Sequence, residues 1–134
     1  MSKYQELAYD VISHAPSEGI FYAFSDKQFE EGMKQCGYTQ TDIDSGRIVK
    51  DGCGGFGTKE AFKKRNDFYK EIQERIKKEC TPEEIFEMEF GNHECGYTGN
   101  WSEALEVVRE YFPDYTPTKE LIQKCFKAYE DANF

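Results

Sequence analysis

The sequence predicts an α+β fold: a single, mostly helical domain of five or six helices with a small two- or three-stranded sheet. Apolar residues recur at helical spacing through most of the chain, and two short apolar runs between turn signals are typical of strands. A length of 134 residues is that of one domain and allows a core without disulfide or metal staples. We find no repeat, low-complexity tract or long linker, so residues 1–134 are expected to form one globular domain.

The first half of the chain alternates capped helices with short apolar runs. Ser2 with Gln5, and Ser25 with Gln28, each match the capping box of a helix start, and Gly37 is a typical helix-terminating residue. The predicted elements are a helix at 3–14, a buried aromatic strand at 20–24, a helix at 26–36, a polar loop at 38–46 and a strand within RIVKDG at 47–52.

The second half of the chain is predicted to be helical. The longest helix, at 59–79, carries one apolar stripe, made of Phe62, Tyr69, Ile72 and Ile76. Thr81 and Pro82 start another helix, in which IFEMEF at 85–90 fits either a helix or a strand. Asn100 with Glu103 forms a further capping box, Pro113 stops that helix, and Thr116-Pro117 starts the last one.

The charge and the cysteine content narrow the range of possible functions. The net charge of −9 argues against direct nucleic-acid binding, which needs a basic surface, but is compatible with binding a basic protein surface. No apolar run approaches the length that spans a bilayer, and the N-terminus has no apolar signal core, so we expect a cytoplasmic protein without membrane contact. The five cysteines are odd in number and unpaired in spacing, so we expect free thiols, no zinc and no cofactor.

The stretch KDGCGGFGTKEAF at 50–62 allows two interpretations. Its glycines suit a tight strand-to-helix turn with positive φ angles. Alternatively, backbone N–H groups at a helix start could hold an anion or nucleotide, although the run matches neither nucleotide-binding fingerprint. The residues of this alternative site are Gly54, Gly55, Gly57, Thr58 and Lys59. Cys53 as a nucleophile would need a histidine base, and neither His14 nor His93 lies in a known partner motif.

A second glycine-punctuated segment, GNHECGYTGN at 91–100, brings His93 and Cys95 within two positions. Both are metal-ligand types, but the paired spacings of a structural zinc site are missing, so a simple bend explains the segment as well. His93, Tyr97 and Trp101 could line a small-ligand pocket beside the bend.

Three stretches, IFYAFSDKQFEEG, GGFGTKEAF and NHECGYTGN followed by EAL, together resemble a pattern seen in small uncharacterised proteins of bacteriophages and other mobile elements. The resemblance carries no activity and assigns no residue a role. It implies a context in which small acidic proteins often inhibit host defences, some by occupying nucleic-acid-binding surfaces.

These observations predict a non-enzymatic binding protein, an inhibitor of a host defence protein or complex that it contacts through an acidic, aromatic surface. The partner is expected to be a protein, including one with a basic nucleic-acid-binding surface. The expected contact residues are Glu30, Glu31, Tyr38, Asp42, Asp44 and Asp51. The alternative is a protein that binds or sequesters a nucleotide or other anion at the glycine-rich turn at 52–58. An enzyme is the least supported class, because no catalytic constellation can be assembled from two histidines and scattered carboxylates.

Overall fold

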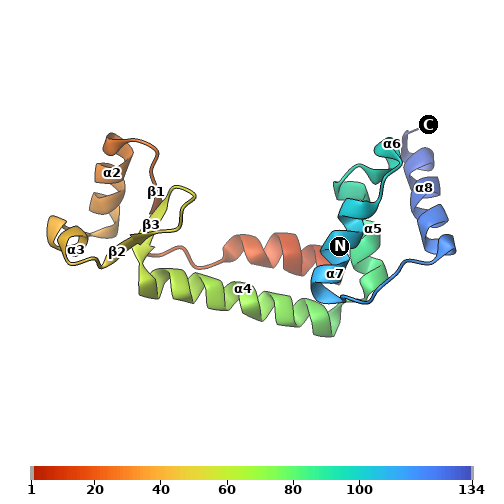
Figure 1. Cartoon of the computed structure of the whole chain (residues 1–134), viewed down its shortest axis with the longest axis horizontal. Coiled ribbons are helices and arrows are strands. Elements are labelled where there is room, and N and C mark those ends of the chain that lie inside the picture. Colours follow the sequence, from red (N-terminus) through yellow and green to blue (C-terminus); the bar gives the residue numbers. More distant parts are fainter. Residues whose placement is uncertain (1, 134) are drawn as a thin grey trace. The chain divides into compact units, whose positions relative to one another are not determined.

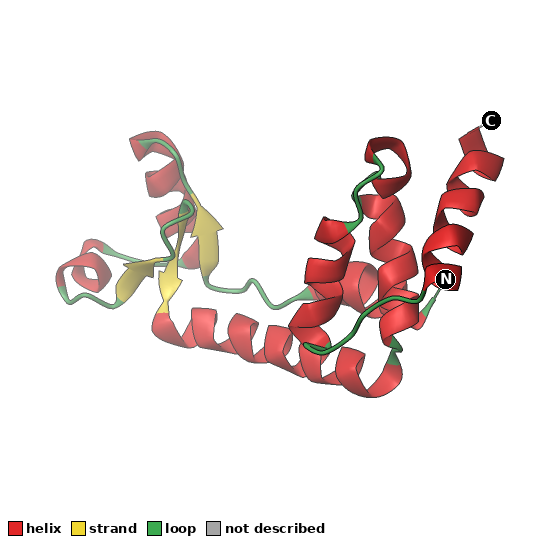
Figure 2. Ribbon diagram, turned by 45° about the vertical axis from the view of Figure 1, so that its right-hand side comes forward, coloured by secondary structure: helices red, strands yellow, loops and turns green. Residues whose placement is uncertain are grey.

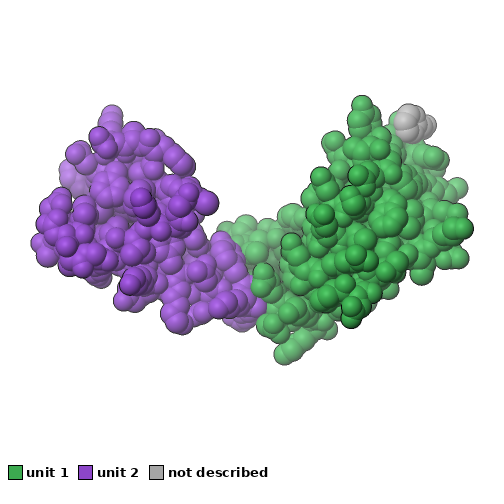
Figure 3. Space-filling model, in the orientation of Figure 1, with its two compact units in different colours: residues 1–13, 72–134 green, residues 14–71 purple. Residues whose placement is uncertain are grey.

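The computed structural model describes residues 2–133 and confirms the α+β class, with helices dominating over one small sheet (Figure 1, Figure 2). The chain divides into two compact units, coloured separately in Figure 3. Unit 1 comprises Met1–Ser13 and Ile72–Phe134, and unit 2 comprises His14–Glu71. The expectation of one domain over 1–134 stays a prediction.

Unit 2 contains a three-stranded antiparallel sheet with the strand order β1-β3-β2. Its elements are β1 (Ile20–Tyr22), α2 (Asp26–Cys36), α3 (Gln40–Asp44), β2 (Ile48–Lys50), β3 (Gly55–Thr58) and the first part of α4 (Lys59–Glu79). The two predicted strands, β1 and β2, are both edge strands. The central strand is β3, which comes from the glycine-rich stretch.

The prediction of a strand-to-helix turn at the glycines is therefore wrong in part. Gly52 and Gly54 have φ angles of 84° and 88° and form the hairpin turn between β2 and β3. Gly55 and Gly57 instead lie buried inside β3. A side chain on Gly57 would meet the backbone of the neighbouring strand segment, because its Cβ would lie 2.6 Å from the Gly19 carbonyl oxygen.

The core of unit 2 is aromatic. Phe21 of β1 stacks on Phe56 of β3 with ring centroids 5.6 Å apart, and Phe29 of α2 packs edge-on against both rings. Gly32 lets α2 approach β1 closely, since a Cβ there would collide with the Phe21 ring. The prediction of an irregular loop at 38–46 is wrong, because Thr39 and Asp42 form a capping box that starts α3.

Unit 1 consists of helices joined by loops, with no strand among its described residues. Its α-helices are α1 (Lys3–Gln5), the end of α4, α5 (Pro82–Asn92), α6 (Cys95–Thr98), α7 (Ser102–Tyr111) and α8 (Lys119–Asn133). The predicted helix at 3–14 is helical in a changing form: α1 continues as a π-helix at Glu6–Val11 and a 3-10 turn at Ile12–His14. Helix α8 begins later than Thr116-Pro117, because Thr118 caps it by accepting a hydrogen bond from the Leu121 N–H.

Helix α5 is the centre of unit 1 and packs against α1, α6, α7 and α8. The IFEMEF run is thus helical. Its apolar residues do not form a single stripe, because neighbouring helices cover α5 on several sides. The fully or almost fully buried side chains of the unit are Tyr4, Leu7, Ile72, Ile76, Ile85, Phe86, Phe90, Cys95, Ala104 and Val108. Across residues 2–133, no helix is long and apolar enough to cross a membrane.

Candidate functional site

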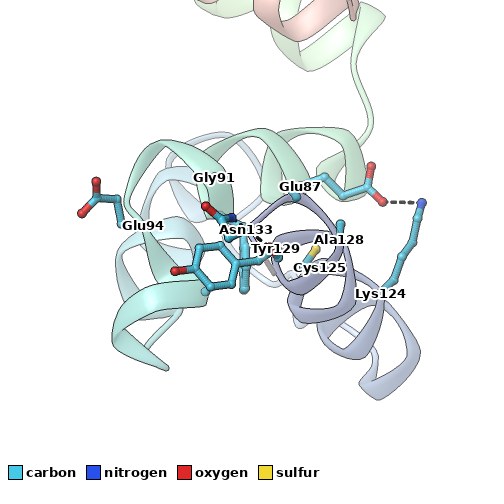
Figure 4. A pocket seen from close by; sticks show the side chains of 11 residues that line it. Glu87, Gly91, Glu94, Lys124, Cys125, Ala128, Tyr129 and Asn133 are labelled. Carbon is cyan, nitrogen blue, oxygen red and sulfur yellow. Dashed lines mark hydrogen bonds and ion pairs between the residues drawn. The ribbon is translucent and has the colours of Figure 1, made fainter.

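An apolar groove of about 480 Å³ opens on unit 1 between α5, α6 and α8 (Figure 4). Its volume falls within the range of ligand and peptide-anchor pockets. The lining residues are Glu87, Phe90, Gly91, Glu94, Gly96, Lys124, Cys125, Ala128, Tyr129, Ala132 and Asn133.

The groove is made by one face of each long helix. On α8, the lining positions from Cys125 to Asn133 recur at the i, i+3, i+4, i+7 and i+8 spacing of a single helix face. On α5, Glu87, Phe90 and Gly91 line the groove at i, i+3 and i+4 spacing, and Glu94 follows the end of the helix. The two faces therefore form a continuous channel along the helices.

Small residues keep the groove open. Gly91, Ala128 and Ala132 contribute little or no side chain to it, and a Cβ on Gly91 would find nothing within 4 Å. Gly96 has a different role, because a Cβ there would collide with the Tyr129 ring. The absence of a side chain at Gly96 lets Tyr129 lie flat against α6.

Charged groups mark the two ends of the groove (Figure 4). At one end, Lys124 Nζ donates a hydrogen bond of 2.7 Å to Glu87 Oε1, and this bond raises the pKa of Lys124. At the other end lies Glu94, whose φ of 53° makes it the one non-glycine residue with positive φ within residues 2–133. This left-handed conformation is unfavourable for glutamate and terminates α5 beside the groove.

The thiol at the groove wall is a poor nucleophile. The Cys125 residue is 6% exposed, and burial raises the pKa of its thiol to about 11. At neutral pH the thiolate, which is the reactive form, is scarce. The groove thus offers an apolar surface with the charged groups of Glu87, Lys124 and Glu94 at its ends.

The negative charge of the chain is concentrated in the unit that carries the groove. Unit 1 has sixteen acidic and eight basic residues, whereas unit 2 has ten and nine. The net charges are thus −8 and −1. Any electrostatic attraction to a basic partner arises mainly from unit 1.

The opposite face of α5 is fixed by a buried carboxylate. Glu89 is 3% exposed and accepts hydrogen bonds from the hydroxyls of Tyr4 (2.5 Å) and Tyr9 (2.6 Å) through Oε1. His93 Nε2 lies 3.1 Å from Glu89 Oε2, and His93 Nδ1 lies 3.0 Å from an oxygen of Glu103 on α7. Glu89 follows Glu87 by two residues, which corresponds to about 200° of rotation around the helix axis. The network therefore lies on the side of α5 away from the groove, where it holds α5 to α7 and to the N-terminal segment.

The predicted contact residues all lie in unit 2, and several are engaged internally. Asp42 accepts a hydrogen bond from the Thr39 N–H and pairs with Arg47 at 2.9 Å, and both contacts lower its pKa. The Tyr38 hydroxyl donates to the Gly19 carbonyl. Asp44 accepts from the side chain of Gln40, while Glu30 and Glu31 are exposed on α2.

The glycine-rich turn already encloses an anion, the carboxylate of Asp51. The Cys53 and Gly55 N–H groups donate to Asp51 Oδ1 at 2.7 and 2.9 Å and lower the pKa of this carboxyl group. Thr58 is buried and caps α4 by accepting from the Ala61 N–H. The donors of the predicted anion site, which also included Gly54, Gly57 and Lys59, are thus largely committed to the fold.

The remaining predicted ligand residues lie in unit 1. His93 belongs to the Glu89 network, and Trp101 packs edge-on against Phe86 with centroids 6.0 Å apart. Tyr97 is 78% exposed on α6, the helix that also contributes Gly96 to the groove. No group of three or more His, Cys, Asp or Glu residues suited to a metal ion occurs in the described part of the chain.

The groove is absent from the sequence-based predictions because its signal is weak. Cys125 and Tyr129 lie at helical spacing in the last helix, a pattern that by itself indicates only a buried face. The small residues Ala128 and Ala132 on the same face, and Gly91 on another helix, are the signal that was available. Only the pairing of α5 with α8 turns them into a surface feature.

A comparison with protein families places residues 3–131 within one family model, described as "Family of unknown function (DUF7659)". No curated protein and no solved structure matches the chain.

Proposed function

We propose that this chain, which belongs to the DUF7659 family, is a non-enzymatic binding protein that holds a partner protein through the acidic surface of unit 1 and the apolar groove on it. The observation that carries this proposal is the location of the groove. An apolar groove with Glu94 at one end and the Glu87–Lys124 pair at the other opens on the unit that bears a net charge of −8. Apolar anchors surrounded by charge of one sign are typical of a specific protein contact.

The side chains that most resemble a catalytic site fit a binding protein better than an enzyme. His93 contacts both Glu89 and Glu103, and both Glu89 oxygens already have partners. A substrate would have to displace two tyrosine hydroxyls to reach the Glu89 carboxylate. The Cys125 thiol, with its raised pKa, is equally unsuited to covalent catalysis.

The context of the interaction comes from the resemblance of three sequence stretches to small proteins of bacteriophages and mobile elements. We carry this resemblance into the proposal: the partner is a host protein of a defence complex, and binding inhibits it. A partner surface that normally holds nucleic acid is basic, and the charge of unit 1 would compete for it.

Salt dependence and charge reversal test the proposal. Candidate defence complexes are passed over the immobilised protein, and bound partners are measured at low and high salt. We expect retention to fall as salt rises, and to fall further in the variant Glu87→Lys/Glu94→Lys. The matched control Glu30→Lys/Glu31→Lys makes the same charge change in unit 2 and should retain the partner.

Two results would contradict the proposal. One is a partner that is lost from the unit 2 control and kept by the unit 1 variant, which would return the contact to the residues predicted from the sequence. The other is catalytic turnover of a nucleotide or protein substrate by the purified chain alone.

A further inference from the structure

We infer that the groove between α5 and α8 receives a short, basic amphipathic helix of the partner. The inference rests on the proposed function and specifies the element that enters the site. Three properties of the groove support it: its length, its small-residue floor and the charges at its ends.

The length fits two turns of helix. The α8 face from Cys125 to Asn133 covers eight residue steps, which is roughly 12 Å of helix rise. Apolar anchors at i, i+4 and i+7 of a helical ligand span roughly 10 Å. Three consecutive anchors on one face of a helix therefore match the channel.

The floor accepts bulky side chains from outside. Ala128 and Ala132 of α8 and Gly91 of α5 leave depressions between larger side chains, and the space above Gly91 is open. Helices pack by inserting the side chains of one into such depressions of another. Leucine, isoleucine or phenylalanine anchors would fill them and cover the apolar wall formed by Phe90 and Tyr129.

The charges select a basic ligand. Glu94 stands at one end of the groove, and no hydrogen bond or ion pair holds its carboxylate within the described residues. Glu87, at the other end, is paired with Lys124, and its carboxylate can accept a hydrogen bond from a second cationic group. A lysine or arginine at each end of the entering helix would meet these carboxylates.

The same charges disfavour the other occupants of an apolar groove. A second copy of the chain would bring another unit of net charge −8 against the first. An anionic membrane surface would be repelled in the same way. A basic helix is the occupant that gains both apolar contact and charge attraction.

A synthetic peptide of leucine and lysine, with leucines at i, i+4 and i+7 and lysine at both ends, is the probe for this inference. Fluorescence anisotropy measures its dissociation constant for the full-length protein. A scrambled peptide of identical composition, which lacks an apolar face, controls for charge alone. We expect the scrambled peptide to bind at least tenfold more weakly.

Two variants place the peptide in the groove. Gly91→Phe fills the open space and should raise the dissociation constant at least tenfold, while Gln123→Phe adds the same ring on the outer face of α8 and should not. Glu94→Lys should raise the constant several-fold, whereas Glu106→Lys makes the same charge change on α7 and should have a smaller effect. Circular dichroism and the thermal transition confirm that each variant is folded.

The inference is wrong if Gly91→Phe binds the peptide as well as the unchanged protein does. It is also wrong if Gly91→Phe abolishes self-association or the binding of an apolar dye while the peptide never binds, because a second copy or a small molecule would then be the occupant. If the peptide fails but a defence complex is still retained and lost on charge reversal, the proposed function stands without this ligand. If neither the peptide nor a defence complex binds, both this inference and the proposed function are wrong.

Discussion

At the scale of single residues, the most constrained group in the protein is the Glu89 carboxylate. It is buried, and the hydroxyls of Tyr4 and Tyr9 from the N-terminal segment and the ring of His93, one turn along, all contact it. A buried polar group is tolerated only when it is hydrogen-bonded in this way. The network behind α5 therefore holds the helix in place while its opposite face lines the groove.

Replacing Glu89 by glutamine should destabilise the protein by about 1–3 kcal/mol, because an amide cannot accept from all the donors that the carboxylate serves. The free energy of unfolding in urea measures the effect. The control Glu106→Gln changes an exposed residue of α7 and should stay within about 0.5 kcal/mol of the parent. Equal stability of the two variants would show that the network does not stabilise the fold.

The same network predicts a loss of stability at alkaline pH. Burial and then the hydrogen bond to Glu89 raise the pKa of Tyr9 to about 12, and they raise the pKa of Tyr4 as well. Since the folded pKa exceeds the unfolded value of about 10, the neutral tyrosines stabilise the fold fully below pH 10 and lose this effect as the pH rises toward 12. Tyrosinate absorbance should show late-titrating tyrosines in the folded protein and one fewer of them in Tyr9→Phe.

At the scale of elements, glycine decides the sheet of unit 2. A run of glycines has low strand propensity, yet β3 is the central strand, and its neighbours leave no room for a Cβ at Gly55 or Gly57. The Asp51 carboxylate then closes the adjoining turn by accepting from the N–H groups of Cys53 and Gly55. The glycines and backbone N–H groups that would suit an anion site are thus used by the turn and the strand themselves.

The variant Gly57→Ala should therefore lose about 1–3 kcal/mol of stability, because its Cβ would meet the rigid Gly19 carbonyl. Chemical denaturation provides the measurement. Gly91→Ala is the contrasting case: its Cβ meets nothing, the position is helical, and a gain of about 0.5–1 kcal/mol is expected. A tolerated alanine at position 57 would contradict the close strand packing.

At the scale of the whole molecule, charge and thiols are unevenly distributed. Unit 1 carries nearly all of the net charge, and its three cysteines are buried, whereas unit 2 exposes Cys53. The five cysteines are all unpaired in the structure. Burial raises the pKa of Cys80 and Cys125 to about 11, and it also raises the pKa of Cys95 and Cys36.

Thiol labelling of the native protein at neutral pH should accordingly show one fast-reacting cysteine, because exposure and thiolate content control the rate. Peptide mapping should identify it as Cys53, and Cys53→Ser should remove the fast phase. After unfolding without reductant, all five thiols should react. Recovery of only three would reveal a disulfide and contradict the expectation from the sequence.

The fold class and the starts of most helices can be predicted from local sequence signals. Capping signals act within three or four residues, so Ser2, Ser25 and Thr81 could be recognised locally, and each accepts the expected backbone hydrogen bond. The two apolar strands were recognisable for the same reason. Helix ends and the form of the N-terminal helix were less predictable, because local rules permit several helical geometries there.

The contacts between distant segments, in contrast, become visible only in the folded chain. Gly57 becomes a strand residue through pairing with Ile20, and Glu89 receives Tyr4 and Tyr9 from about eighty positions away along the chain. The groove likewise requires α5 and α8 to lie side by side, so that Gly91 and Ala128 share one channel. Such contacts depend on long-range packing, which leaves no periodic pattern in the sequence and selects among many locally acceptable arrangements.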